Sequence, residues 1–189
     1  MRMPPLLSIV GRKHVGKTTL VVRLCAELRR RGVRVMTIKH GSHTFNLDPA
    51  TTDTYRHFHE GEADAVAMIS PDRFAMVMRW GAELTPEVVA ARYMQDADLV
   101  LCEGFKKSSI AKIEVFRTGA HSQSLADTGE IDPATVVAMV TDAAEYHAPC
   151  PVFQLGDAQW LTSLADFVQH WWEEERRRDA TGTLAADPE

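Results

Sequence analysis

The sequence lacks several features that would assign it to a large class of protein. It has only three cysteines in 189 residues, and Cys25, Cys102 and Cys150 are far apart with no Cys-x-x-Cys pair. We therefore expect neither a disulfide framework nor a cysteine-rich metal centre, and we interpret Cys25 and Cys102 as small buried side chains. No apolar run approaches the roughly 20 residues of a membrane span, and the first residues do not resemble a signal peptide. These absences predict a cytoplasmic protein that does not cross a membrane.

A strong charge of one sign is also missing. The chain carries 21 basic and 26 acidic residues, a net charge of -5, and they are spread along its length. Such a chain offers no strongly positive surface to a phosphate backbone, so we expect no nucleic-acid partner. Its length and its hydrophobic content of 45% suit one substantial core. We expect one domain over residues 1–178 and a disordered tail over residues 179–189.

An alternation of strand and helix patterns begins near the N-terminus. The apolar run 6–10 predicts a strand, residues 17–31 have apolar positions at helical spacing, and residues 33–38 are rich in β-branched side chains. This βαβ pattern indicates a parallel crossover. Further strands are expected at 98–102, 110–116, 135–141 and 151–155, and further helices at 54–60, at 86–95 and from Asp157. The pattern predicts a three-layer α/β fold with a mostly parallel sheet.

Residues 65–80 break this alternation. Two apolar segments, 65–69 and 74–80, are separated only by Ser70-Pro71-Asp72-Arg73, which predicts an antiparallel hairpin. A hairpin at a sheet edge would expose unpaired backbone groups as well as apolar side chains. Pairing with a second copy of the chain would cover both, and so would packing of the helix at 86–95 in the same chain. The hairpin is therefore a candidate dimer element.

The segment with the clearest chemical meaning is a glycine-rich turn between the first strand and the first helix. It has the spacing Gly-x-x-x-x-Gly-Lys-Thr, in which backbone N–H groups and a helix N-terminus can bind a polyphosphate. Lys17 would neutralise the β and γ phosphates, and the Thr18 hydroxyl would bind Mg²⁺, so these two residues are the catalytic candidates. The residues expected to contact a nucleotide here are Gly11, Arg12, Lys13, His14, Val15, Gly16, Lys17, Thr18 and Thr19.

A second magnesium ligand is expected at the carboxyl end of a neighbouring strand. Glu103 follows the continuous apolar run Leu99–Cys102 and is the candidate. Asp98 lies at the opposite end of the same strand, so we interpret it as a surface or capping residue. The alternative role for Glu103 is an ion pair with a basic residue such as Lys106.

Three further positions are candidates for contact with the ligand. Lys39 and His40 end the second strand on the side where such sheets bind ligands, and they would contact phosphate or substrate. Asp142 ends another core strand, where its carboxylate could accept two hydrogen bonds from guanine; its alternative role is that of a helix cap or turn residue. A transition-metal site is a further hypothesis, and the alternative is ordinary loop histidines; the histidines concerned are His40, His43, His57 and His59.

Several of these segments together resemble the MobB family of GTP-binding adaptor proteins of molybdopterin-guanine dinucleotide biosynthesis. The most discriminating are Glu103-Gly104-Phe105-Lys106 after a strand and Ile110-Ala111-Lys112-Ile113. The others are the Gly11 to Thr19 loop, Thr37 to His40, Asp48, Asp53-Thr54 and Val140 to Asp142. The resemblance implies a P-loop fold of the dimeric signal-recognition and partition-protein type, GTP with Mg²⁺, and weak hydrolysis. It also implies molybdopterin as the pathway compound and the nucleotidyltransferase MobA as a partner, with the molybdenum-inserting protein MoeA as a further candidate.

The sequence departs from this family in two places. Many relatives have Gly-Lys-Asp-Ser where this chain has Thr51-Thr52-Asp53-Thr54, so any role of that lysine cannot be transferred. Arg12 stands where partition-type relatives carry a lysine that reaches across a dimer. Arg12 could therefore act across a subunit interface, or its side chain could simply be solvated. In such relatives the hairpin that corresponds to residues 65–80 contributes to dimerisation.

We therefore expect a GTP–Mg²⁺-binding accessory factor with weak GTPase activity at most. A small-molecule kinase is the alternative, because residues 41–62 are long enough to form an acceptor-binding loop. A scaffold that binds nucleotide only to order its dimer, without turnover, is a third hypothesis.

Overall fold

The chain folds into two compact units. The computed structural model describes residues 3–41 and 48–182, with side chains through Arg178. One unit comprises Met1–His40 and Pro86–Glu189, and the other comprises Gly41–Thr85. The sequence predicts one domain over residues 1–178, and the contacts divide this range into a unit that carries the main sheet and a unit inserted into it.

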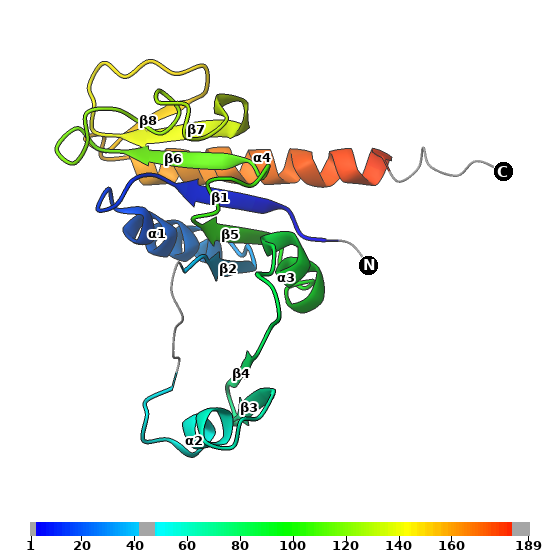
Figure 1. Ribbon diagram of the computed structural model, residues 1–189. Coiled ribbons are helices and arrows are strands. Elements are labelled where there is room, and N and C mark those ends of the chain that lie inside the picture. The colour runs from blue at the N-terminus through cyan, green and yellow to red at the C-terminus, as the bar shows by residue number, and fades with distance from the viewer. Residues whose placement is uncertain (1–2, 42–47, 183–189) are drawn as a thin grey trace. The chain divides into compact units, whose positions relative to one another are not determined.

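A six-stranded, wholly parallel sheet forms the centre of the first unit (Figure 1). Its strand order is β2-β5-β1-β6-β7-β8, so the strands that flank β1 come from much later in the sequence. Every strand was expected, and the observed bounds differ from the predictions by two residues at most. The strands are β1 (Leu6–Val10), β2 (Val35–Lys39), β5 (Leu99–Glu103), β6 (Lys112–Phe116), β7 (Val136–Thr141) and β8 (Val152–Gln154).

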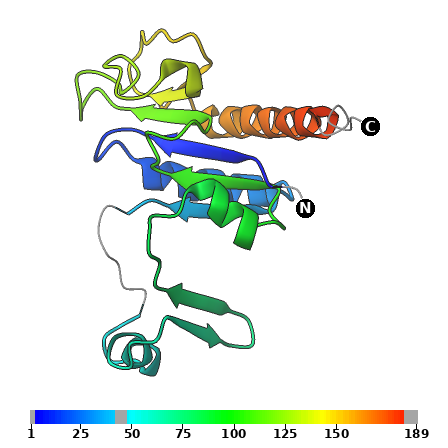
Figure 2. The same ribbon diagram turned by 45° about the vertical axis from the view of Figure 1, so that its right-hand side comes forward.

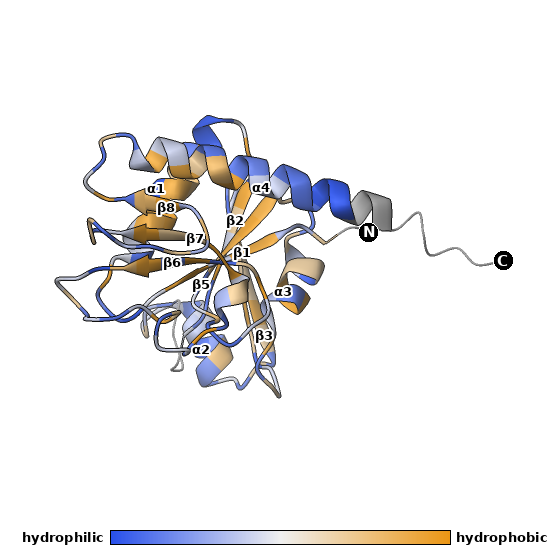
Figure 3. Cartoon of the chain, turned by 90° about the horizontal axis from the view of Figure 1, so that it is seen from above, coloured by the Kyte–Doolittle hydropathy of each residue, from blue (hydrophilic) through white to orange (hydrophobic). Residues whose placement is uncertain are grey.

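Helices cover both faces of this sheet, as Figure 3 shows. Helices α1 (Lys17–Arg30) and α4 (Trp160–Gly182) pack on one face, where Leu7 and Ile9 of β1 belong to the main core. Helix α3 (Pro86–Tyr93) packs on the other face, against a smaller core that includes Leu6. The alternation of side chains along a strand explains why neighbouring residues of β1 enter different cores. The predicted three-layer α/β fold with a mostly parallel sheet is confirmed.

Helix α4 is longer than the sequence suggested. The tail was expected from Asp179, but the helix continues to Gly182, so this boundary is corrected by four residues. Glu173–Arg178 continues the helix, and ion pairs one turn apart support it, including Arg177 with Glu173 at 3.7 Å and Arg178 with Glu175 at 2.8 Å. Residues 183–189 of the predicted tail lie outside the described part of the chain. No helix within residues 3–41 and 48–182 is both long and apolar enough to cross a membrane.

The second unit is built from one short helix and the predicted hairpin (Figure 2). Helix α2 (Asp53–His59) begins after Thr52, whose hydroxyl accepts a hydrogen bond from the Tyr55 N–H at 3.2 Å. Strands β3 (Ala65–Ile69) and β4 (Phe74–Met78) pair in antiparallel register. The turn between them closes with a bond from the Ser70 N–H to the Arg73 carbonyl at 2.8 Å. The predicted hairpin and short helix are therefore confirmed.

Candidate functional site

The glycine-rich turn lies where the sequence predicts it, between the end of β1 and the start of α1. Gly11 and Gly16 have positive φ angles of 147° and 96°, and His14 has a φ of 64°. A Cβ atom at Gly11 would lie 2.4 Å from the Val115 carbonyl oxygen, so this position has no room for a side chain. The turn ends at Lys17, the first residue of α1, where the first N–H groups of the helix have no acceptor within the helix.

Within this turn, the side chains take different directions. Val15 is buried in the main core, so only its backbone is available to a ligand. Lys13, His14, Thr18 and Thr19 are exposed. The turn therefore offers backbone groups together with the Lys17 and Thr18 side chains as its binding surface.

Lys17 lies folded over the turn. Its Nζ donates a hydrogen bond of 2.6 Å to the Arg12 carbonyl. Burial lowers the pKa of the Lys17 ammonium; the carboxylate of Glu103 opposes this shift, and the charges of Lys106 and Lys39 add to it. Three ammonium groups thus lie around one carboxylate, and a further anion among them would stabilise all three positive charges.

The structure brings together the two predicted magnesium ligands. The Thr18 hydroxyl donates to Oε1 of Glu103 at 2.9 Å, although the residues are 85 positions apart. Glu103 ends β5, and its side chain is only 12% exposed. Glu103 also forms the kind of ion pair that was its alternative role, with Lys39 at 3.2 Å. Two hard oxygen donors in contact suit Mg²⁺, which binds one or two protein oxygens and keeps several waters.

Lys39 and His40 reach the same site. Lys39 is 65% exposed, so its ammonium could leave Glu103 if another cation bound there. The His40 N–H donates to the Glu103 carbonyl at 3.0 Å, and its ring contacts that of Phe105 in a tilted arrangement, with centroids 5.1 Å apart. Just before the other end of β5, the carboxylate of Asp98 accepts from the N–H of Arg34, the residue before β2, at 2.9 Å. The surface or capping role predicted for Asp98 is confirmed.

Arg12 is held within its own chain. Its guanidinium forms an ion pair of 2.5 Å with Glu130 and donates to the Thr128 hydroxyl at 3.2 Å and the Gln123 carbonyl at 3.3 Å. These acceptors lie on the segment between β6 and β7, which the sequence analysis did not connect with the site. The same segment contacts the turn a second time, through His121 Nε2 and the Lys13 carbonyl at 2.9 Å. No periodic pattern in the segment could have indicated these contacts.

Asp142 lies at the end of β7, as predicted, and its carboxylate is already engaged. It accepts from the Arg117 guanidinium at 2.9 Å, from the Thr118 N–H at 2.7 Å and from the Thr118 hydroxyl at 3.1 Å. Partial burial raises the pKa of Asp142, but these three bonds outweigh it and hold the pKa below its ordinary value. Recognition of guanine by Asp142 stays a prediction. It would require that some of these hydrogen bonds be replaced by bonds to the base.

A pocket of about 130 Å³ lies beside the glycine-rich turn. Gly16 and Thr19 form one part of its wall, and Arg117, which contacts Asp142, forms another. Trp160 closes it, with the Arg23 guanidinium 5.7 Å from the centre of the indole ring. Sequence analysis did not connect Trp160, the first residue of α4, with the site.

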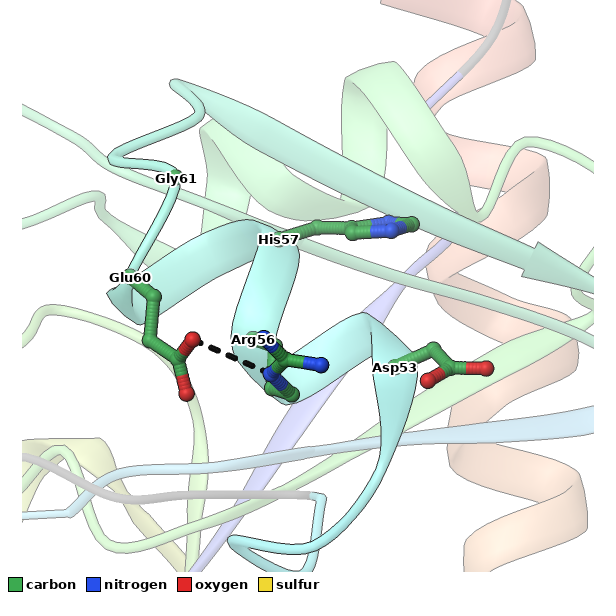
Figure 4. Close-up of a pocket in the computed structure, with 5 residues that line it drawn as sticks. All are labelled: Asp53, Arg56, His57, Glu60 and Gly61. Atoms are coloured by element: carbon green, nitrogen blue, oxygen red, sulfur yellow. Dashed lines mark hydrogen bonds and ion pairs between the residues drawn. The ribbon is translucent and has the colours of Figure 1, made fainter.

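A larger hollow of about 370 Å³ lies in the second unit, along α2 (Figure 4). Asp53 and His57 extend to one side of the helix, whereas Arg56 and Glu60 pair with each other at 3.0 Å. Asp53 is the acid retained from the family pattern. Among residues 3–41 and 48–182, no group of three or more His, Cys, Asp or Glu is placed to hold a metal ion, and His43 lies outside these ranges.

The parallel sheet and the turn between β1 and α1 define a P-loop NTPase fold. Comparison with known proteins gives the family: residues 6–142 match MobB, described as molybdopterin guanine dinucleotide synthesis protein B. The chain is 33% identical over 179 residues to the molybdopterin-guanine dinucleotide biosynthesis adapter protein of Escherichia coli, covering 92% of this chain and 96% of that protein. It is 31% identical to the Haemophilus influenzae protein of the same name, covering 88% and 89%.

The fold agrees with these matches. The crystal structure of a MobB protein homolog from Bacillus stearothermophilus superposes with a TM-score of 0.64 at 26% identity, covering 87% of this chain and 98% of that one. The chain belongs to the MobB family.

Proposed function

We propose that this protein is an adapter in molybdopterin guanine dinucleotide biosynthesis that binds GTP with Mg²⁺ and hydrolyses it weakly at most. The observation that carries the nucleotide part is the convergence of Lys17, Thr18 and Glu103 at one end of the parallel sheet. The family match and the adapter names of the relatives support the pathway.

In this proposal the backbone of Gly11–Thr18 and the Lys17 ammonium bind the β and γ phosphates. Lys17 would give up the Arg12 carbonyl for phosphate oxygens, which are stronger acceptors because they are charged. Thr18 and Glu103 would hold the magnesium ion, and Mg²⁺ would supply positive charge against the phosphate oxygens. Lys39 would then move from Glu103 towards the phosphates.

The pocket beside Gly16 and Thr19 is our candidate for the base and ribose. Trp160 offers an aromatic wall, and Arg117 links the pocket to Asp142. We propose that Asp142 reads the guanine edge. Any hydrolysis would rest on the positive charges around Lys17 and on the metal.

We also propose that the second unit mediates assembly, with a second copy of the chain and with the nucleotidyltransferase MobA. Its hairpin exposes large apolar side chains, including Ile69 at 79% and Phe74 at 65%, and such side chains on a hairpin mark an interaction surface. MoeA is a further candidate partner, and molybdopterin is the compound delivered. We place this function in the cytoplasm, where free thiols such as those of Cys25, Cys102 and Cys150 persist.

Calorimetric titration with GTP and with ATP, each with and without Mg²⁺, tests the nucleotide site. Lys17→Ala is expected to weaken GTP binding by roughly 10–100-fold, because it removes a charge-assisted contact. Lys107→Ala is the matched control, since Lys107 is an exposed lysine close to the site in sequence. Equal affinity of the Lys17 and Lys107 variants for GTP would refute the phosphate site.

Asp142→Ala tests the choice of base. The variant is expected to bind GTP and ATP with similar affinity, whereas the wild-type protein should prefer GTP. An unchanged preference would remove Asp142 from the base site. Incubation with GTP and candidate acceptor molecules, followed by product analysis, distinguishes this proposal from a kinase. Free phosphate would indicate hydrolysis, and a phosphorylated acceptor would indicate a kinase.

A further inference from the structure

Two polar side chains are buried side by side beneath the segment that follows Glu103. Ser8 of β1 and Lys112 of β6 pair in register in the parallel sheet, and both are 0% exposed. Alternation along β1 places Ser8 on the same face as Leu6, which belongs to the core under α3. A serine and a lysine in this position interrupt an otherwise apolar layer.

Both side chains bond to the backbone of residues 104–110. The Ser8 hydroxyl donates to the Gly104 carbonyl at 2.9 Å. The Lys112 ammonium donates to the Ser108 carbonyl at 2.6 Å and to the Ile110 carbonyl at 2.8 Å. Two buried side chains therefore hold three carbonyls of one short segment, at its beginning and at its end.

Burying the Lys112 side chain here costs free energy that an apolar side chain would not cost. Burial disfavours the charged ammonium and lowers the pKa of Lys112, and the charge of Asp132 only partly opposes this. A methionine would fill a similar volume without a buried charge. What the methionine could not do is donate hydrogen bonds to the carbonyls of Ser108 and Ile110.

The segment held in this way is bent where it leaves the metal ligand. Gly104 and Phe105, the two residues after Glu103, have φ angles of 105° and 55°. A left-handed phenylalanine is uncommon and persists only when its surroundings impose it. A bond from the Ser108 hydroxyl to the Phe105 carbonyl at 2.8 Å ties the bend to the part that Lys112 holds.

We propose that Lys112 and Ser8 are positioning residues for the magnesium site: they fix the bend after Glu103, so that its carboxylate meets the Thr18 hydroxyl. The inference rests on the proposed function, because it assigns these two residues to that site. It also gives a physical role to the segment Ile110-Ala111-Lys112-Ile113, whose lysine is otherwise unexplained.

Lys112→Met tests the role of the ammonium, with Lys107→Met as the matched control because Lys107 is exposed on the same segment. In ligand-free protein, amide hydrogen exchange over residues 104–110 is expected to be about tenfold faster in Lys112→Met, because the carbonyls of Ser108 and Ile110 lose their hydrogen bonds to the ammonium. Exchange in β7 and α4 should not change. In the control, exchange over residues 104–110 should match that of the wild type.

The second readout is the gain in GTP affinity that Mg²⁺ provides. In Lys112→Met this gain is expected to fall by roughly 10–100-fold, the usual effect of losing a group that orients a metal ligand. Binding of GTP in EDTA should change much less, because the Gly11–Thr18 turn is intact. Ser8→Ala should show the same pattern to a smaller degree, and it serves in place of Lys112→Met if that variant does not fold.

The possible outcomes separate the two proposals. A folded Lys112→Met with wild-type exchange over residues 104–110 would overturn the positioning role, whether or not GTP binds. Faster exchange together with a wild-type magnesium gain would also overturn it, since the bend would then not serve the metal. A wild-type protein that does not bind GTP at all would instead defeat the proposed function.

Discussion

Gly11→Ala is expected to destabilise the folded protein more than Gly16→Ala does, although both glycines lie in the same turn. At Gly16 a new Cβ would have nothing within 4 Å, so its cost comes only from the φ of 96°. A left-handed alanine costs about 1–2 kcal/mol, partly offset by about 0.4–1 kcal/mol from the restricted unfolded chain. The net effect at Gly16 should therefore be about 1 kcal/mol.

At Gly11 a steric cost is added to the conformational one. The new Cβ would lie 2.4 Å from the Val115 carbonyl oxygen and 2.9 Å from a methyl of Val15. Either β6 or the turn must move, which typically costs about 1–3 kcal/mol in a packed interior. The total for Gly11→Ala should thus be about 2–4 kcal/mol.

Urea unfolding measures both values, and a constant m-value would show that the unfolded state is unchanged. The informative quantity is the difference between the two variants, because both glycines have a positive φ but only Gly11 adds a close contact. If Gly11→Ala unfolds at the same urea concentration as Gly16→Ala, the close approach of the turn to β6 is not rigid and the reasoning fails.

Two further predictions concern pH. Lys17 has a folded pKa below its ordinary 10.5, and a bound phosphate should raise this pKa again. GTP affinity should therefore fall as the pH rises towards 10.5. At a pH above the lowered pKa, calorimetry should detect proton uptake when GTP binds. An affinity that is constant over this range would contradict a binding ammonium. Asp142 has a folded pKa below its ordinary 3.8, so it stabilises the fold above that pH and loses this contribution as the pH falls through the folded pKa. Asp142→Asn should flatten the acid side of the stability curve, and a curve identical to that of the wild type would show that the bonds to Arg117 and Thr118 contribute nothing.

The meeting of Thr18 with Glu103 could be predicted because it follows from topology. Parallel strands present their carboxyl ends at one edge of the sheet, so a residue after β1 and the last residue of β5 had to approach each other. The bounds of the strands could also be predicted, because strands buried on both faces of a parallel sheet consist of continuous apolar runs. The strands and their approximate positions along the chain could thus be predicted from the sequence.

The environment of Lys112 and Glu114 could not be predicted. Their alternation with Ile113 and Val115 is typical of a strand with one solvated face, yet both charged residues are buried. Glu114 accepts hydrogen bonds from the N–H groups of Leu125 and Ala126, on the irregular segment before β7. Such partners come from a segment without periodicity, and only the folded chain shows them.

The contacts of Arg12 were missed for a related reason. Its acceptors include the Gln123 carbonyl, a backbone group that every residue possesses and that no sequence pattern marks. Helix α4 shows a different error: the tail was expected from Asp179, but the helix continues to Gly182.

The position of β1 in the sheet has a consequence for synthesis of the chain. Its two neighbours pair with it through residues such as Val100 and Lys112, so the ribosome must make more than half of the protein before Leu6–Val10 finds either partner. Until then this apolar strand has no neighbouring strand to pair with. The unit Gly41–Thr85 has by then been synthesised completely, so all the residues that contact one another within it are present. The inserted unit can therefore fold first during translation, and closure of the large sheet around β1 is the late event.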